Sequence, residues 1–172
     1  MFVAILLLAA ATSVPSQTDV IAQVRAGKML CSNPDPAKKT CSTIDTYAVG
    51  ENGAFINTGE ILFSADQQLT LETSSIVQIE KGTICGVMAL ADLQKGKIRF
   101  NGTLLPPDRN ALVLDKIIER LSPLAGRKAC EALRVEDGQL MKYGQVEGID
   151  INLPGKPVSW LTAADGYKVA PR

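Results

Sequence analysis

The stretch STIDTYAVGENGAFINTGEILFS, residues 42–64, decides the fold, because two alternating, β-branched segments flank a tight turn in it. Asn52 and Gly53 tolerate the positive φ angles that a two-residue hairpin turn requires. We therefore expect an antiparallel hairpin here.

Segments of the same type follow along the chain. QLTLET (68–73), SIVQIE (75–80) and TICGVM (83–88) come first, with a turn at Lys81 and Gly82. A small hairpin is expected around Asn101 and Gly102, and a second strong one at Asp137 and Gly138. GIDINL (148–153) and PVSWL (157–161) supply further strands. Together with the hairpin at residues 42–64, the segments 68–73, 75–80 and 83–88 predict an antiparallel meander of four or five strands.

Helical patterns are fewer. Residues 16–29 predict a short helix with Thr18 as N-cap, and residues 90–96 a helical turn ended by Gly96. The clearest helix spans residues 106–121, with Asp108 as N-cap and an apolar stripe at i, i+3, i+4 and i+7 formed by Leu114, Ile117, Ile118 and Leu121. A second helix is expected over 122–133, since Ser122 and Pro123 suit a cap and first turn.

Strands in runs and helices in a separate run predict an α+β fold. In this interpretation an antiparallel β-sheet meander is packed on one face by helices. The expected organisation is a signal peptide at residues 1–16 followed by a single α+β domain at residues 17–172, because no repeat or linker divides the rest of the chain.

The N-terminal segment MFVAILLLAAATSVPSQ favours export. An apolar run is followed by small residues suited to processing, as in a secretory signal peptide. The run is shorter than the roughly 20 residues a membrane-spanning helix needs, so a permanent anchor is the weaker interpretation. The basic residue that usually precedes the apolar core is missing. We expect a secreted or periplasmic protein without a stable membrane span after processing.

Four cysteines suit such an oxidising compartment. Cys31, Cys41, Cys85 and Cys130 allow three pairings. The sequential pairing is favoured, because Pro34 and Asp35 suit a turn that brings the first two together. The two bridges would contribute roughly 3 and 4 kcal/mol on the chain-entropy model. A redox pair or a zinc site is the weaker interpretation, since neither Cys-x-x-Cys spacing nor any histidine is present.

The composition excludes several function classes. Eighteen basic side chains balance eighteen acidic ones, which gives no indication of a nucleic-acid partner. The lack of histidine removes Ser-His-Asp and Cys-His activation, and no phosphate-binding or dinucleotide motif occurs. The sequence therefore predicts no cofactor, no metal site and no catalytic residue of a familiar type.

Carboxylates remain as candidates for an enzyme, for instance a glycoside-cleaving pair. Those available are Glu51, Glu60, Asp92, Asp137, Glu147, Asp150 and Asp165, and the simplest interpretation is that they are solvated. Asp45 and Tyr47 form a possible polar constellation, although an alternating strand predicts the same pattern. Trp160 and Tyr167 could form a recognition surface, but a single Trp in a strand is more often core.

These observations predict an exported, disulfide-stabilised domain with a non-catalytic binding or structural role. Its partner would be a protein, an envelope component or a small ligand. The alternatives are a small carboxylate-dependent hydrolase and a thiol redox or metal-binding protein.

Overall fold

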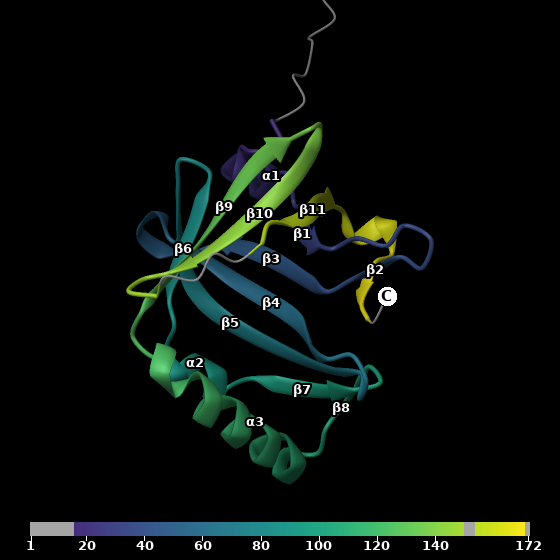
Figure 1. Cartoon of the computed structure of the whole chain (residues 1–172), viewed down its shortest axis with the longest axis vertical. Helices are drawn as coiled ribbons and strands as arrows, with labels where there is room; N and C mark the ends of the chain where they lie inside the picture. The colour runs from purple at the N-terminus through teal and green to yellow at the C-terminus, as the bar shows by residue number, and fades with distance from the viewer. Residues whose placement is uncertain (1–15, 150–153, 171–172) are drawn as a thin grey trace, which may run out of the picture.

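The computed structural model describes residues 16–149 and 154–170 of this chain (Figure 1). All but the last residue of the predicted signal peptide, and residues 150–153 of an expected strand, lie outside these ranges. The helices are α1 (Val20–Arg25), α2 (Leu90–Gln94) and α3 (Pro107–Leu121), and the 3-10 turns are η1 (Glu51–Gly53), η2 (Ser122–Leu124) and η3 (Ala163–Asp165). The strands are β1 (Met29–Ser32), β2 (Thr40–Cys41), β3 (Thr43–Val49), β4 (Phe55–Ser64), β5 (Leu69–Glu80), β6 (Thr83–Val87), β7 (Lys97–Phe100), β8 (Thr103–Leu104), β9 (Lys128–Glu136), β10 (Gln139–Val146), β11 (Lys156–Leu161) and β12 (Lys168–Val169).

Eight of the strands form a closed antiparallel barrel. Going around it, β1, β3, β4, β5, β6, β9, β10 and β11 are neighbours in chain order, and β11 pairs back onto β1. The predicted α+β fold, an open meander packed on one face by helices, is therefore wrong. Pairing between the first and last strands closes the sheet, and closure satisfies the peptide groups that two open edges would expose.

The helices also lie elsewhere than expected. Figure 1 shows α1 at one end of the molecule and α2 with α3 at the opposite end. Helix α1 packs Val20 and Val24 among inward-facing side chains of the barrel such as Leu30 and Ile84. Helix α3 packs Leu114 and Ile117 on Leu71 and Ile98 of the β5–β7 extension, which is a separate core. No single face of the sheet carries the helices.

The turns follow the local signals in the sequence. Asn101 and Gly102 have φ angles of 48° and 77°, and Asp137 and Gly138 have 49° and 78°, as tight primed turns require. The corresponding hairpins are β7–β8 and β9–β10. Asn52 and Gly53 also take positive φ angles, but within η1 rather than a two-residue turn.

The helix expected over residues 122–133 is absent from the structure. A 3-10 turn, η2, occupies its start, and β9 begins at Lys128. Strand β9 lies between β6 and β10 and pairs with both, so ladder formation overrides the helical propensity of this segment. Two caps also differ from expectation: Asp19, not Thr18, caps α1, and Asp108 lies in the first turn of α3, whose N-cap is Pro106.

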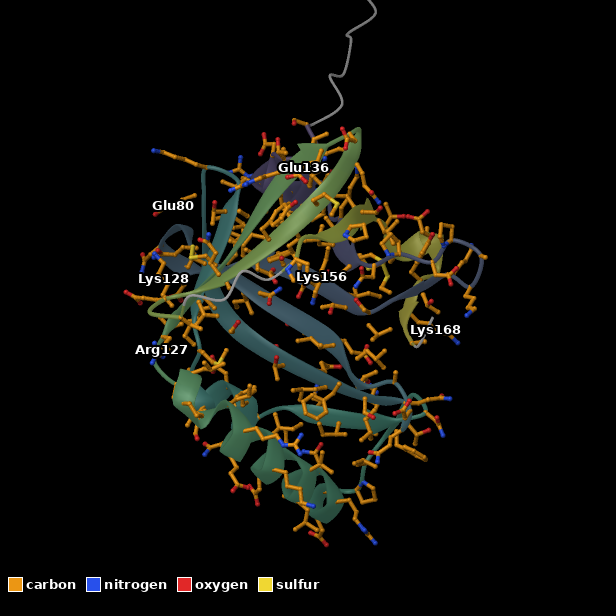
Figure 2. The ribbon with its side chains drawn as sticks, viewed as in Figure 1. Glu80, Arg127, Lys128, Glu136, Lys156 and Lys168 are labelled. Carbon is orange, nitrogen blue, oxygen red and sulfur yellow. A yellow bond between two sulfur atoms is a disulfide. The ribbon has the colours of Figure 1, made fainter. Side chains whose placement is uncertain are left out.

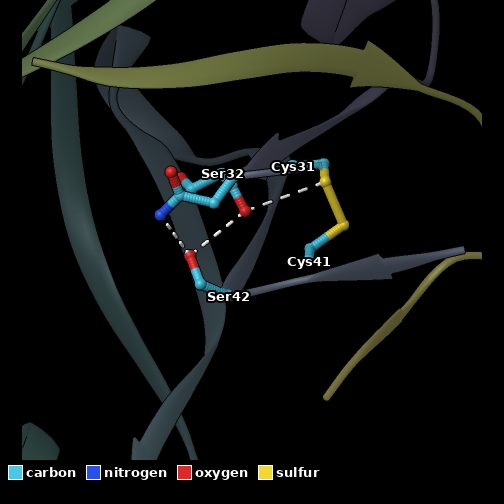
Figure 3. Close-up of a disulfide and its surroundings, with 5 residues drawn as sticks. Cys31, Ser32, Cys41 and Ser42 are labelled. Carbon is cyan, nitrogen blue, oxygen red and sulfur yellow. Dashed lines mark hydrogen bonds between the residues drawn. A yellow bond between two sulfur atoms is a disulfide. The ribbon is translucent and has the colours of Figure 1, made fainter. Parts of the chain in front are cut away.

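The cysteines pair sequentially. Cys31 is bonded to Cys41 and Cys85 to Cys130, and no cysteine is free. Around the first bridge, the Ser42 hydroxyl donates to the Ser32 carbonyl at 3.1 Å and holds the end of the loop between Cys31 and Cys41 against β1 (Figure 3). The second bridge joins two neighbouring strands. The bridge therefore does not involve a helix, although Cys130 falls in the helix predicted over residues 122–133, because this cysteine lies on β9.

Candidate functional site

Strand β5 has a gap in its pairing on one side. Its other side pairs with β4 almost continuously, whereas on this side β7 pairs only with Leu69–Glu72 and β6 only with Val77–Glu80. Between β6 and β7 the chain leaves the sheet to form α2. Within the described ranges, no strand stands opposite residues 73–76 on this side.

The register shows which peptide groups are directed at this gap. Cys85 and Cys130 face each other with Cα atoms 4.1 Å apart, a separation typical of a pair without mutual hydrogen bonds. The peptide groups of Cys85 are therefore directed at Gln78 of β5. Because the direction alternates along a strand, Ile76 and Ser74 direct their peptide groups to the same side. Ser74 lies in the middle of the gap.

A groove of about 810 Å³ lies over this gap, and we call it the β5 groove. Strands β4–β7, helix α2 and the first residue of β9 contribute to it. Three exposed apolar side chains line it, Ile56, Ile76 and Val87, and Ile76 is 70% exposed. Exposed apolar side chains gathered in a hollow are typical of an interaction site.

The charges around the β5 groove are mainly basic. Glu72 is held by Lys97 and Arg99, each with a nitrogen 2.9 Å from a Glu72 oxygen. Hydrogen bonds from these two cations lower the pKa of Glu72 below its usual value. Lys95 and Lys128 line the same groove, are exposed, and form no ion pair with the described part of the chain. Figure 2 shows Lys128 next to Arg127, at the end of the barrel that faces α2.

A second polar feature lies inside the barrel. The Lys142 ammonium of β10 is 3.4 Å from an Asp45 oxygen of β3 and 2.9 Å from a Glu131 oxygen of β9. Strands β3 and β10 are not neighbours, so the Lys142–Asp45 contact crosses the interior. Asp45 and Lys142 are each 7% exposed, whereas the side chain of Glu131 is 40% exposed.

Burial shifts the pKa values of this cluster. Burial, only partly offset by the Lys142 charge, raises the pKa of Asp45. Burial lowers the pKa of Lys142, but the attraction of Glu131 and Asp45 outweighs it, and the pKa is raised. Lys142 therefore remains an ammonium near neutral pH, which does not suit a nucleophile or a general base. The cluster lies in the barrel interior beside the apolar core and is best explained as a largely buried ion network.

The candidate carboxylates are scattered. Asp165 caps η3 by accepting from the Thr162 backbone at 2.7 Å, and Glu60 accepts from the Thr70 hydroxyl at 2.6 Å. Asp150 lies outside the described ranges. Among the described residues, no two of these candidates share a hydrogen-bonding or ion-pair partner. Two pairs of carboxylates meet at one cation, Asp45 with Glu131 at Lys142 and Glu60 with Glu72 at Arg99. Of these four, Glu60 alone was among the candidates.

The remaining predicted positions have structural surroundings. Trp160 is partly buried against the barrel core, and its indole N–H donates to the Gln17 carbonyl at 2.8 Å. Tyr167 lies apart, half-buried, just before β12. Tyr47 packs against the barrel core on the same face of β3 as Asp45, as an alternating strand predicts. Among the described residues, no group of three or more potential ligands is placed to hold a metal ion.

Sequence reasoning missed Lys142, although a signal was present. Lys142 is two positions from Leu140, so an alternating strand directs both side chains to one face. A lysine on an apolar face needs a buried counter-charge. The β5 groove had no such local signal, because it depends on where two other strands stop.

Comparisons with protein-family models, with curated proteins and with solved structures found no match. None of the helices in the described ranges has the length and apolar content needed to cross a membrane.

Proposed function

We propose that this chain is an exported, disulfide-stabilised barrel that binds a ligand in the β5 groove and catalyses no reaction. The groove itself carries the proposal. It combines exposed apolar side chains, two lysines that form no ion pair with the described residues, and a strand segment that lacks a neighbour on one side. Hollows of this type bind ligands by apolar contact and use a few polar groups for orientation.

Two observations support export into an oxidising compartment. The four cysteines form two disulfides, which persist outside the reducing cytosol. The N-terminal sequence has the pattern of a secretory signal. We infer that the mature protein is secreted or periplasmic.

Expression with the native N-terminal segment tests the export proposal. Mass spectrometry should find a mature chain that starts between about Thr12 and Gln17. Alkylation before reduction should label no cysteine. An uncleaved chain with labelled thiols would contradict export.

Binding is tested with 1-anilinonaphthalene-8-sulfonate, an apolar anion. We expect its fluorescence to report binding, and amide shifts in NMR spectra to cluster at Ile76, Val87 and Lys95. Ile76→Glu should weaken binding by about tenfold, because it places a charge on the apolar floor. Val49→Glu is the matched control, since Val49 is 71% exposed and lies outside the groove. Equal weakening by both variants, or shifts elsewhere, would contradict the proposal.

A carboxylate-dependent hydrolase is the second candidate, and one observation favours it. Asp45 and Glu131 approach the same ammonium, and burial raises the pKa of Asp45, as in a general acid. If a panel of chromogenic glycosides and esters is hydrolysed, Glu131→Gln should abolish the activity. Activity that Glu131→Gln leaves unchanged, or no activity on the panel, removes this candidate.

A further inference from the structure

We propose that the occupant of the β5 groove is an extended peptide segment carrying acidic side chains, which adds a short strand to β5 between β6 and β7. This inference rests on the proposed binding role of the groove.

The backbone of β5 favours a peptide over other ligands. Ser74 directs its peptide groups into the gap, and within the described ranges no strand stands opposite it on the side of β6 and β7. A strand that lacks a neighbour is a template for another strand, because both carry the same alternating donors and acceptors. Fatty chains and aromatic rings offer no such series of groups.

The size of the gap sets the length of the added strand. Strands β6 and β7 limit it at Val77 and Glu72 of β5, which leaves four residues without a neighbour on this side. At about 3.3 Å per residue, these four span roughly 13 Å. A partner segment of about four residues therefore fits, with its flanks leaving along the groove.

The side chains of the groove add specificity. Ile76 and Val87 are 70% and 56% exposed and lie in the groove. Because side chains alternate along a strand, every second residue of the added segment would reach them. The partner should therefore carry apolar residues at alternate positions.

The charges favour an acidic partner. Lys97 is already neutralised by Glu72, whereas Lys95 and Lys128 form no ion pair with the described residues. Lys95 follows α2 and Lys128 begins β9, so the two come from different walls of the groove. Asp92 is the remaining acidic side chain in the lining, which leaves an excess of positive charge. Carboxylates on the partner would complement it.

Selection from a phage-displayed library of random octapeptides, carried out on the mature protein, tests the inference. We expect the enriched peptides to combine alternating apolar residues with Asp or Glu. The double variant Lys95→Glu/Lys128→Glu should bind synthetic copies of these peptides about tenfold more weakly. Lys38→Glu/Lys116→Glu is the matched control, because both lysines are exposed and lie outside the groove.

Hydrogen exchange tests the strand geometry. The bound peptide should slow exchange at the Ser74 amide, while the Ser75 amide, directed at β4, should not change. A peptide N-methylated at its central residues should lose binding, because it lacks the backbone N–H donors that pair with β5. It keeps its charges and apolar groups, so these cannot account for the loss.

The outcomes separate the two proposals. Binding of 1-anilinonaphthalene-8-sulfonate in the groove without peptide enrichment would overturn the peptide inference and leave the binding role intact. Enrichment of basic peptides, or equal binding after N-methylation, would also overturn it. So would protection of the Ser74 amide without peptide, if sedimentation shows that the chain then self-associates. If neither probe binds in the groove, both proposals fail.

Discussion

Gly59 stands opposite Asp45 in the β3–β4 pair, and the space it leaves holds the Asp45 carboxylate. A Cβ atom at position 59 would lie 2.8 Å from Asp45 Oδ1, closer than normal contact. The carboxylate cannot move freely, because it is buried against Lys142. We expect Gly59→Ala to lower the free energy of unfolding, measured with urea, by about 1–3 kcal/mol.

A double-mutant cycle provides the control for this prediction. In an Asp45→Ala background the added methyl group meets no carboxylate, so Gly59→Ala should cost markedly less. Strictly additive costs would show that the two residues are not coupled, and would contradict this explanation of Gly59.

The stability of the barrel should fall in alkaline solution. Burial first, and then the negative charge of Asp45, raise the pKa of Tyr47 well above its ordinary value of 10.0. The pKa of Lys142 is likewise raised above its ordinary 10.5, where the attraction of Glu131 and Asp45 outweighs burial. The folded chain therefore keeps both protons to higher pH than the unfolded chain. The stability they contribute is fully present below about pH 10 and is lost as the pH rises further.

Urea unfolding between pH 8 and pH 11 measures this dependence. Tyr47→Phe removes one of the two titrating groups, so the decline above pH 10 should become shallower. A variant with the same slope as the original protein would mean that Tyr47 does not contribute to it.

Helix α3 offers a direct comparison of buried and exposed leucines. Leu114 is 3% exposed and packs on Leu71 and Ile98, whereas Leu112, two residues earlier, is 60% exposed. Leu114→Ala should lower the free energy of unfolding by about 2–5 kcal/mol, because it leaves a cavity. Leu112→Ala should change it by less than about 0.5 kcal/mol. Similar effects of both variants on urea unfolding would contradict the packing of α3.

Strand β5 shows what local patterns can and cannot predict. The sequence predicts separate strands at residues 68–73 and 75–80, with Ser74 as the interruption between them. The structure has one strand of twelve residues there, because β4 pairs across the interruption. The pairing that is interrupted near Ser74 is the one on the other side of β5, where β7 pairs only as far as Glu72 and β6 only from Val77 onward. The site therefore lies where the sequence predicted a break, but its cause is non-local.

The helix predicted over residues 122–133 failed for a related reason. Its signals, Ser122 and Pro123, produce only the 3-10 turn η2. From Lys128 onward, the segment is a strand that pairs with β6, which is distant in sequence, and with β10, which follows it. Turns such as Asp137–Gly138 were predictable, because the required φ angles depend on the turn residues themselves.

Closure of the barrel was not predictable from local patterns. It depends on β1 pairing with β11, where Leu30 stands opposite Trp160. Alternation within each strand shows that one face is buried, but it does not show which strands become neighbours. The same limit applies to the interior network, since Asp45 and Lys142 meet only because the sheet closes.

Removing the closing strand should therefore unfold the molecule. A chain ended after Gly155 lacks β11 and exposes the free edges of β1 and β10. It also lacks Val158 and Trp160, which pack in the barrel core. We expect this chain to lose its β-type circular dichroism or to aggregate on size-exclusion chromatography. A chain ended after Leu161 is the control, because it loses only η3 and β12, which pairs with β2 outside the barrel, and should remain folded. If the shorter chain stays folded and monomeric, the β1–β11 pair is not what holds the barrel together, and the interior core and the two disulfides must suffice without it.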